Sequence, residues 1–550
     1  MIDIGLLRYL GNLKFGAELY YSVLMHDRHE MLAIGAACKL IDQGLGLDQN
    51  FDRLVELSRY RAVRDKLLPT LLRTYPLEML VTILEQEAHP AKFSVDDLTK
   101  ARMARDAEKT IECLCELFKA TGNYEWIEEA LSASPQASSI ELAMEIAVVN
   151  ILLAPDNGLW ALSLFDTLVA RGANESLREL LGIIEAAGQY EALASIIRIR
   201  LALTDGQQEV AGQELEKLGA YELPEPVQYQ VDKLFAEFLE AQGKYKEACE
   251  YFNRQNLWIR SETYKEGAYL EYVTEFNNVK FSSAPPDTHD NYLIMLGFPR
   301  SGTTLLENIL DSHPSIRTLE EIGSLAEPDT LLRRYLANHP GMETVPPEMV
   351  MRMRAAYYDS LNASVEVGTA RFFIDKMPIM SSRATYLKNL FGNKRYIFSI
   401  RHPYDVVLSC YKQAFGTNLA MDCFTSFEES CRTYDFVMQL WFSNFDLGSE
   451  EVCYVKYDDL CNKFDEEVTR VLNFIGVDWD PAVRDFAENA KMRAQKTPSY
   501  GKVKLGNTIG VQSSWRKYQF LFEKPEARLL DKWVTFFGYE GLSINDAIQH

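Results

Sequence analysis

The segment YLIMLGFPRSGTTLLENIL, residues 292–310, constrains the fold of this chain more than any other part of it. It contains an apolar run, then a loop with two glycines, then an amphipathic helical pattern. A buried strand that turns through a tight loop into a helix is typical of anion-binding loops, because free backbone N–H groups at the helix start face the ligand. The segment therefore predicts an α/β domain with an anion site at the end of a strand.

The loop also carries side chains that suit one small tetrahedral anion. These candidate ligands are the guanidinium of Arg300 and the hydroxyls of Ser301, Thr303 and Thr304, with Gly302 in the turn. In the triphosphatase version of the loop, G-x-x-x-x-G-K-S/T, a lysine reaches the terminal phosphates. Thr303 occupies that position here, which disfavours a P-loop kinase or ATPase but leaves a kinase as an alternative.

The second half of the chain has the pattern of a parallel sheet covered by helices. Its apolar runs alternate with helical stretches. The runs are Leu293–Leu296, Phe372–Ile374, Tyr396–Ile400 and Val452–Val455. Residues 278–291, NVKFSSAPPDTHDN, are rich in Ser, Pro and Asp and break the helical period. We therefore predict a linker at residues 281–290 and an α/β domain at residues 291–550.

The first half has the pattern of an all-helical domain. Apolar residues recur at three- and four-residue spacing from about residue 15 to 275. Gly243, Tyr245, Ala248 and Phe252 have the spacing of the turn and second helix of a tetratricopeptide (TPR) repeat, which this stretch resembles. We predict that residues 1–280 form an α-solenoid of degenerate TPR-like repeats, either with a concave surface for a peptide or partner protein or as a structural brace.

Charge and cysteine content exclude several classes of partner and compartment. The net charge is −22, and residues 1–290 hold 28 basic and 46 acidic side chains against 29 and 33 in the rest. Such acidity disfavours general binding to nucleic acid or to an anionic membrane. The nine cysteines form no C-x-x-C pair, and no secretory signal or membrane-spanning apolar stretch is apparent. We expect reduced thiols and a cytoplasmic protein.

The loop GFPRSGTT resembles the 5′-phosphosulfate loop of sulfotransferases that use 3′-phosphoadenosine 5′-phosphosulfate (PAPS). In particular, the chain resembles bacterial sulfotransferases with a TPR-containing N-terminal domain, which are related to tyrosylprotein sulfotransferases. The resemblance covers roughly Asn291 to Tyr539, and the helical first half agrees with the same architecture. It implies a P-loop-like sulfotransferase domain with a central parallel sheet.

The resemblance also implies a site for the rest of the donor nucleotide. In residues 395–411, Arg401 follows a predicted strand and Ser409 lies eight residues on, about two helical turns away. In the resembled family an Arg and a Ser at this spacing bind the 3′-phosphate of PAPS. Tyr457 matches a family tyrosine beside adenine, although a core aromatic at a strand end is an equally simple interpretation.

A general base is needed because a hydroxyl attacks sulfur better as it loses its proton. Glu321 lies twenty-one residues beyond Arg300, where the similar families carry a catalytic glutamate. Glu320 is its neighbour, and we expect its side chain to point elsewhere. Small-molecule sulfotransferases use a K-x-H motif, but here Lys376 is followed by Met377 and Pro378, so the base role falls to glutamate. Lys376 is then implied to neutralise the bridging oxygen of the donor.

Two histidines near these motifs are alternative bases. His313 precedes a proline and His402 follows Arg401, and we predict structural roles for both.

A basic segment near the end of the chain suggests a lid over a polyanionic nucleotide. Residues 490–522 contain no Asp or Glu but several Lys and Arg. Ser499 and Trp515 are sixteen residues apart, which matches an active-site serine and a later G-R-W-like motif in the resembled family. Ser514 stands where that motif has a basic residue, so Arg516 or Lys517 would replace it.

Together these residues imply transfer of the sulfuryl group of PAPS to a hydroxyl of a protein tyrosine, a glycan or a small phenol. The expected reaction is an in-line transfer that needs no metal ion, because a sulfuryl group carries less negative charge than a phosphoryl group. The alternative from another class is a non-catalytic helical scaffold with a nucleotide-sensing domain. The presence of both Glu321 and Lys376 favours the enzyme.

Overall fold

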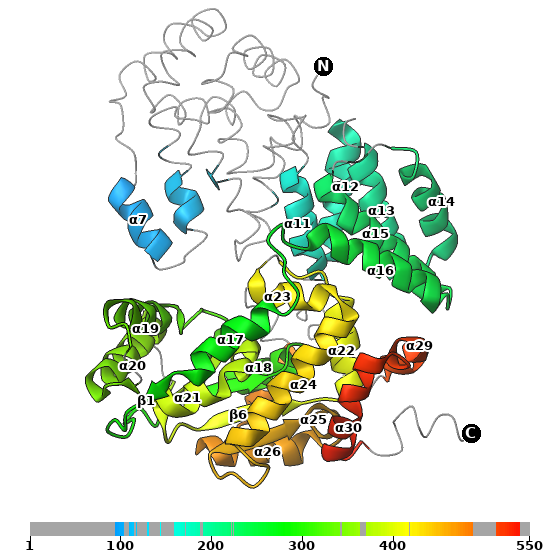
Figure 1. Ribbon diagram of the computed structural model, residues 1–550. Coiled ribbons are helices and arrows are strands. Elements are labelled where there is room, and N and C mark those ends of the chain that lie inside the picture. The colour runs from blue at the N-terminus through cyan, green and yellow to red at the C-terminus, as the bar shows by residue number, and fades with distance from the viewer. Residues whose placement is uncertain are drawn as a thin grey trace, which may run out of the picture. The chain divides into compact units, whose positions relative to one another are not determined.

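The computed structural model describes residues 94–103, 109–114, 117, 129–130, 144, 159–170, 172–187, 191–221, 223, 225–341, 344–363, 370–416, 418–487 and 513–539. Contacts divide the chain into two compact units (Figure 1). The first unit comprises residues 1–227 and 494–496, and the second comprises residues 228–493 and 497–550.

The described part of the first unit is helical, as predicted. Its helices are α7 (Val95–Met103), α11 (Leu159–Ala170), α12 (Asn174–Ala187), α13 (Glu191–Thr204) and α14 (Gln208–Leu218), and from α11 onwards each packs on the next. Helix α12 buries Leu177, Leu180 and Ile184, which share one face at helical spacing. The repeat character of this region stays a prediction.

Helices α15 (Glu225–Ala241) and α16 (Tyr245–Ile259) form the hairpin expected at Gly243. Gly243 has a φ of 75°, a left-handed conformation that glycine adopts without strain. Ala248 is fully buried in α16, and the rings of Phe235 and Tyr251 stack across the hairpin at 4.9 Å. The local turn and helix start are therefore those that the TPR-like spacing indicates.

By contacts, α16 and α17 (Ala268–Asn278) belong to the unit that holds the sheet. Asn256 Nδ2 donates a 2.9 Å hydrogen bond to the backbone oxygen of Tyr411, and the hydroxyls of Tyr269 and Ser382 lie 2.7 Å apart. The division into a domain at residues 1–280, a linker at 281–290 and a domain at 291–550 stays a prediction.

The segment that we predicted as a linker is held firmly by this second unit. Strand β1 (Lys280–Phe281) pairs in parallel with β4 (Thr344–Val345). Asp287 is buried, forms a 3.0 Å ion pair with Lys394 and accepts a hydrogen bond from Tyr358. Burial alone would raise the pKa of Asp287, but the Tyr358 hydrogen bond and the Lys394 charge lower it to about 2.

The main sheet has five parallel strands in the order β3-β5-β2-β6-β7. They are β2 (Tyr292–Gly297), β3 (Ile316–Glu320), β5 (Phe372–Lys376), β6 (Tyr396–Ile400) and β7 (Val452–Lys456). Four of them confirm the predicted apolar runs. Strand β3 was missed because IRTLE contains no continuous apolar run, since Arg317 and Thr318 separate Ile316 from Leu319.

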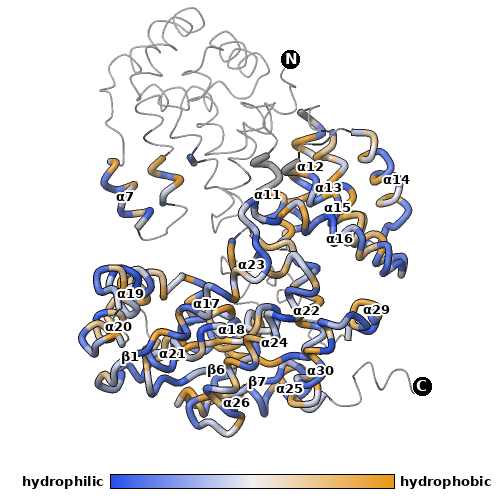
Figure 2. The backbone as a smooth tube through the Cα atoms, in the orientation of Figure 1, coloured by the Kyte–Doolittle hydropathy of each residue, from blue (hydrophilic) through white to orange (hydrophobic). Residues whose placement is uncertain are grey.

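Alternation along the strands creates two cores, one on each face of the sheet. In β2, Leu293 and Met295 pack with α18 (Thr303–Asp311), α25 (Tyr457–Asn462) and α26 (Phe464–Ile475). Ile294 and Leu296 pack on the opposite face, in the core of α20 (Pro347–Asn362), α21 (Ala384–Phe391), α22 (Pro403–Tyr411) and α24 (Phe427–Asn444). Figure 2 shows hydrophobic, orange stretches of the backbone around β6.

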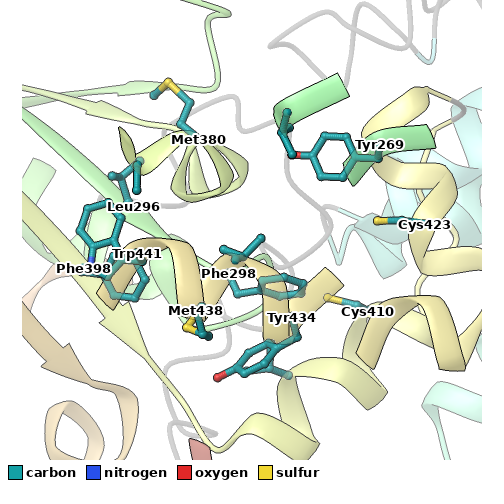
Figure 3. Packing of buried hydrophobic residues seen from close by; sticks show 14 of the residues in the cluster. Tyr269, Leu296, Phe298, Met380, Phe398, Cys410, Cys423, Tyr434, Met438 and Trp441 are labelled. Atoms are coloured by element: carbon teal, nitrogen blue, oxygen red, sulfur yellow. The ribbon is translucent and has the colours of Figure 1, made fainter. Parts of the chain in front are cut away.

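The second core reaches the loop after β2. Figure 3 shows Phe298 of that loop beside Tyr434, with ring centroids 4.9 Å apart, and Phe398 stacked on Trp441 at 4.4 Å. Aromatic packing of this kind holds the loop's first residue rigidly against α24.

The remaining described elements are helices that connect the strands or follow the last strand, β7. They are α19 (Ala326–Asn338), η2 (Pro378–Arg383), α23 (Leu419–Asp422), η3 (Cys423–Thr425), η4 (Pro481–Arg484), η5 (Ser514–Tyr518), α29 (Gln519–Phe522), η6 (Pro525–Leu530) and α30 (Asp531–Phe536). Within the described helices, no segment has the length and apolarity needed to cross a bilayer.

The docking of α16 and α17 predicts that the sheet-bearing unit is unstable without them. A chain starting at Lys280, which keeps β1 and Asp287, should unfold at least about 10 °C below one starting at Glu225, since about 1 kcal/mol shifts the Tm of a domain this size by about 2–4 °C. Thermal unfolding of both truncated chains measures the difference. Equal Tm values would show that α15–α17 contribute nothing to this core.

Candidate active site

Topology brings the predicted site residues to one edge of the sheet. The anion loop follows β2, Glu321 follows β3, and Lys376 is the last residue of β5. Arg401 follows β6, and Tyr457 follows β7. Because all five strands are parallel, their carboxyl ends lie at the same edge. The chain leaves β2 toward β3 on one side of the sheet and leaves β6 toward β7 on the other, so the direction of the connections changes between β2 and β6. Ligands of open α/β folds bind at such a switch point.

The anion loop has a backbone that only particular residues can form. Gly302, at the start of α18, has a φ of 97°, and a Cβ there would lie 2.5 Å from Cδ2 of Tyr457. Arg300 has a φ of 71°, which is unfavourable for a residue with a side chain. Strained backbone that the surrounding packing maintains is concentrated at functional sites.

The loop presents hydroxyls that suit an anionic ligand. Thr303 and Thr304 are buried at the first turn of α18. Ser301 is only 2% exposed, and its Oγ has no hydrogen-bond partner among the residues that the structure describes. A buried hydroxyl without a partner is costly, and an anion oxygen placed in the loop would remove that cost. The loop therefore fits a phosphate or sulfate group.

Arg300, Arg401 and Ser409 are close together, although their pairing differs from the simplest expectation. Arg300 Nε donates a 3.1 Å hydrogen bond to Ser409 Oγ, and an Arg401 nitrogen lies 3.4 Å from the Arg300 backbone oxygen. Burial, with a contribution from the nearby Arg401 charge, lowers the pKa of Arg300. The neighbouring guanidinium groups create a positive region suited to a polyanion.

Tyr457 contacts both the anion loop and Arg401. Its ring packs against Gly302 and lies under the Arg401 guanidinium, 4.9 Å from the ring centroid. Burial raises the pKa of Tyr457 to about 12. Its ring therefore joins the anion loop to the loop after β6.

Lys376 is the centre of a buried cluster of charges. Its Nζ lies 3.0 Å from carboxylate oxygens of Glu307 and Glu321 and 3.5 Å from one of Glu320. Burial alone would lower the pKa of Lys376, but these three carboxylates raise it above its usual value. Lys376 is therefore a fixed positive charge.

The expectation that Glu320 points away from Glu321 is wrong. Residues that follow each other in a regular strand point to opposite faces. Glu321 has a φ of 47°, which breaks this alternation, and both carboxylates reach Lys376. Their exposure differs, because the Glu321 side chain is 40% exposed and that of Glu320 only 10%. Glu321 is thus the more exposed of the two carboxylates.

Glu307 is a site residue that the sequence analysis missed. It lies in α18, one helical turn beyond Thr303, and both it and Lys376 are fully buried. The available signal was a carboxylate next to Leu306 in a helical segment that also contains Leu305, Ile309 and Leu310. Such a residue usually indicates a buried ion pair.

In the C-terminal segment, Arg516 and Lys517, the two candidates to replace the basic residue expected at Ser514, lie against different aromatic rings. Trp515 stacks on His402 at 5.4 Å, and its backbone N–H donates to Asp405. Arg516 lies over the Trp515 ring at 5.1 Å, whereas Lys517 lies over Tyr245 of α16 at 5.7 Å. Ser499 lies outside the described residues.

Both histidines make the structural contacts expected of them. The His402 Nδ1 accepts a hydrogen bond from the backbone N–H of Tyr404 at the start of α22. The His313 Nδ1 accepts one from the backbone N–H of Ser315.

Comparisons with known proteins identify the same region. Residues 293–481 match the model of the sulfotransferase family. An uncharacterized protein of Aquifex aeolicus is 24% identical over 301 residues, covering 52% of this chain and 38% of that protein. Protein-tyrosine sulfotransferase 2 of Gallus gallus is 24% identical over 200 residues, covering 34% of this chain and 51% of that protein.

A solved mouse sulfotransferase, SULT7A1 complexed with PAP, is 12% identical, with a TM-score of 0.29 and coverage of 50% of this chain and 96% of that one. The chain spans about two fifths of the length of the Aquifex protein and about half of the length of the Gallus gallus protein. Residues 293–481 thus match the sulfotransferase family, and the chain is distantly similar to protein-tyrosine sulfotransferases.

Proposed function

We propose that the domain at residues 291–550 transfers the sulfuryl group of PAPS to a hydroxyl group of an acceptor, without a metal ion and with Glu321 as the base. The observation that carries this proposal is that an anion-type loop and a lysine–glutamate ion pair lie at the same edge of the sheet. The loop has Thr303 in place of the triphosphatase lysine. The ion pair joins buried Lys376 and accessible Glu321.

The described residues fit the two anionic ends of this donor. Arg300, the backbone amides at the start of α18 and the hydroxyls of Ser301, Thr303 and Thr304 would hold the 5′-phosphosulfate. Arg401 and Ser409 would hold the 3′-phosphate, and Tyr457 would lie beside adenine. Arg516, which lies over Trp515 beside the Arg401 loop, is the better placed replacement for the missing basic residue, since Lys517 lies over Tyr245.

In the proposed reaction PAPS supplies the sulfuryl group and leaves as the 3′,5′-bisphosphate. Glu321 accepts the proton of the acceptor hydroxyl as the oxygen attacks sulfur. Lys376, held protonated by its carboxylates, places a positive charge where the leaving oxygen becomes more negative. By the family resemblance, Ser499 would add a contact at the reacting group.

The acceptor is a protein tyrosine, a glycan or a small phenol. The helical repeat region would supply a binding surface for a peptide or partner protein. A labelled-donor screen of these three acceptor classes tests the proposal directly, and transfer to none of them would contradict it.

Glu321→Gln should lower kcat by about 10²–10⁴-fold, the usual loss when a general base is removed. Binding of the bisphosphate product should not change, because Gln is nearly isosteric and Glu321 does not contact the nucleotide in this proposal. Glu320→Gln is the matched control, since it also removes a carboxylate beside Lys376, and it should have little effect. The reverse pattern in steady-state kinetics would assign the base to Glu320.

Arg401→Ala should remove the preference of the protein for the 3′,5′-bisphosphate over AMP. Loss of a buried charge-assisted contact should cost about 2–5 kcal/mol of binding free energy for the bisphosphate alone. Lys517→Ala is the control, because that cation lies over Tyr245, and it should retain the preference. Calorimetry that finds equal affinities for both nucleotides in the unmodified protein would refute the assignment of Arg401.

Activity should persist in excess EDTA. The reason is that the anion loop lacks the lysine of magnesium-dependent triphosphatases, while Arg300 and Lys376 supply positive charge. Initial rates with and without chelator measure this. Complete loss that magnesium restores would favour the kinase alternative.

A further inference from the structure

The loop that carries Glu321 is attached to two successive residues of β5. The Glu321 backbone N–H donates a 2.9 Å hydrogen bond to the backbone oxygen of Lys376. Three residues further along the loop, the Ser324 hydroxyl donates a 2.6 Å hydrogen bond to Oδ2 of Asp375. These two contacts fix both ends of the short turn at residues 321–324.

Strand alternation places the Asp375 side chain where it can accept the hydrogen bond from Ser324. Neighbouring side chains of β5 point to opposite faces of the sheet. Lys376 therefore reaches Glu307 of α18, whereas Asp375 faces α20 and accepts a 2.8 Å hydrogen bond from the Tyr357 hydroxyl. Asp375, Ser324 and Tyr357 are each no more than 1% exposed.

A carboxylate in this position is difficult to explain as packing alone. Burial raises the pKa of Asp375 to about 6, against the opposing effects of the Ser324 and Tyr357 hydrogen bonds and the Lys376 charge. The surrounding core is apolar, and a buried polar group is unfavourable unless its hydrogen bonds are made. Such a group does, however, fix directions that apolar packing leaves open.

The turn needs such an anchor because its backbone is strained. Glu321 has a φ of 47°, a left-handed conformation that is unfavourable for a residue with a side chain. Without the contact at Ser324, Glu321 could return to an ordinary φ, and its carboxylate would turn away from Lys376.

We propose that Asp375 is a positioning residue for Glu321, which it holds in place through the hydrogen bond to Ser324. This inference rests on the proposed function, because it gives Glu321 the role of base.

The test is a double-mutant cycle between Ser324→Ala and Glu321→Gln, with Asp375→Asn as a second variant. Ser324→Ala should lower kcat about 10- to 100-fold, the range expected from a small misplacement of a reacting group, with the KM for the donor unchanged. In the Glu321→Gln background it should have no further effect, since the group that it positions is already lost. An equal loss of kcat in both backgrounds, or none in either, would overturn the proposal.

Tyr357→Phe is the matched control, because it removes a hydrogen bond to the same Asp375 oxygen without touching the turn. It should lower the Tm but change kcat by less than about twofold. A fall in kcat as large as that of Ser324→Ala would overturn the proposal, since the effect would then not arise at the turn.

Hydrogen exchange separates this inference from the proposed function. Ser324→Ala should speed exchange of the amides of residues 321–325, whether or not the protein transfers sulfuryl groups. Unchanged exchange would show that Asp375 does not hold the turn. Absence of transfer by the unmodified protein to every acceptor would instead refute the proposed function.

Discussion

The candidate site depends on one buried charge, the ammonium group of Lys376. A buried charge is tolerated only when opposite charges surround it, and three carboxylates do so here. They come from the anion-loop helix, the end of β3 and the turn after it. One cation therefore sets the distance between the anion loop and the proposed base. Loss of the ammonium would leave three carboxylates facing one another. The Lys376 ammonium therefore constrains the positions of Glu307, Glu320 and Glu321.

Strand β5 connects this cluster to the rest of the fold. Its last two residues have buried charged side chains on opposite faces of the sheet, Lys376 toward α18 and Asp375 toward α20. Each also contacts the turn that contains Glu321. The turn is thus held through both faces of one strand, and a shift of β5 would disturb the anion loop and the base together.

Much of the fold could be predicted from local pattern, and the exceptions have physical causes. Continuous apolar runs identified four of the five strands, because buried parallel strands are apolar on both faces. Strand β3 gave no such signal, because Arg317 and Thr318 interrupt its apolar residues. The orientation of Glu320 was mispredicted because the alternation of a strand stops at the left-handed φ of Glu321, which spacing does not reveal.

Residue identity and spacing alone determined which candidate groups the chain offers. They are an anion-type loop without the triphosphatase lysine, an Arg and a Ser two helical turns apart, and a glutamate with a lysine but no histidine. Only the tertiary structure decided which of these groups meet. It paired Ser409 with Arg300, made Glu307 a counter-ion of Lys376, and joined α16 and α17 to the core beside the sheet. The reason is that sequence patterns reflect local periodicity, whereas these contacts join residues far apart in the chain, which only the strand order and the packing on each sheet face bring together.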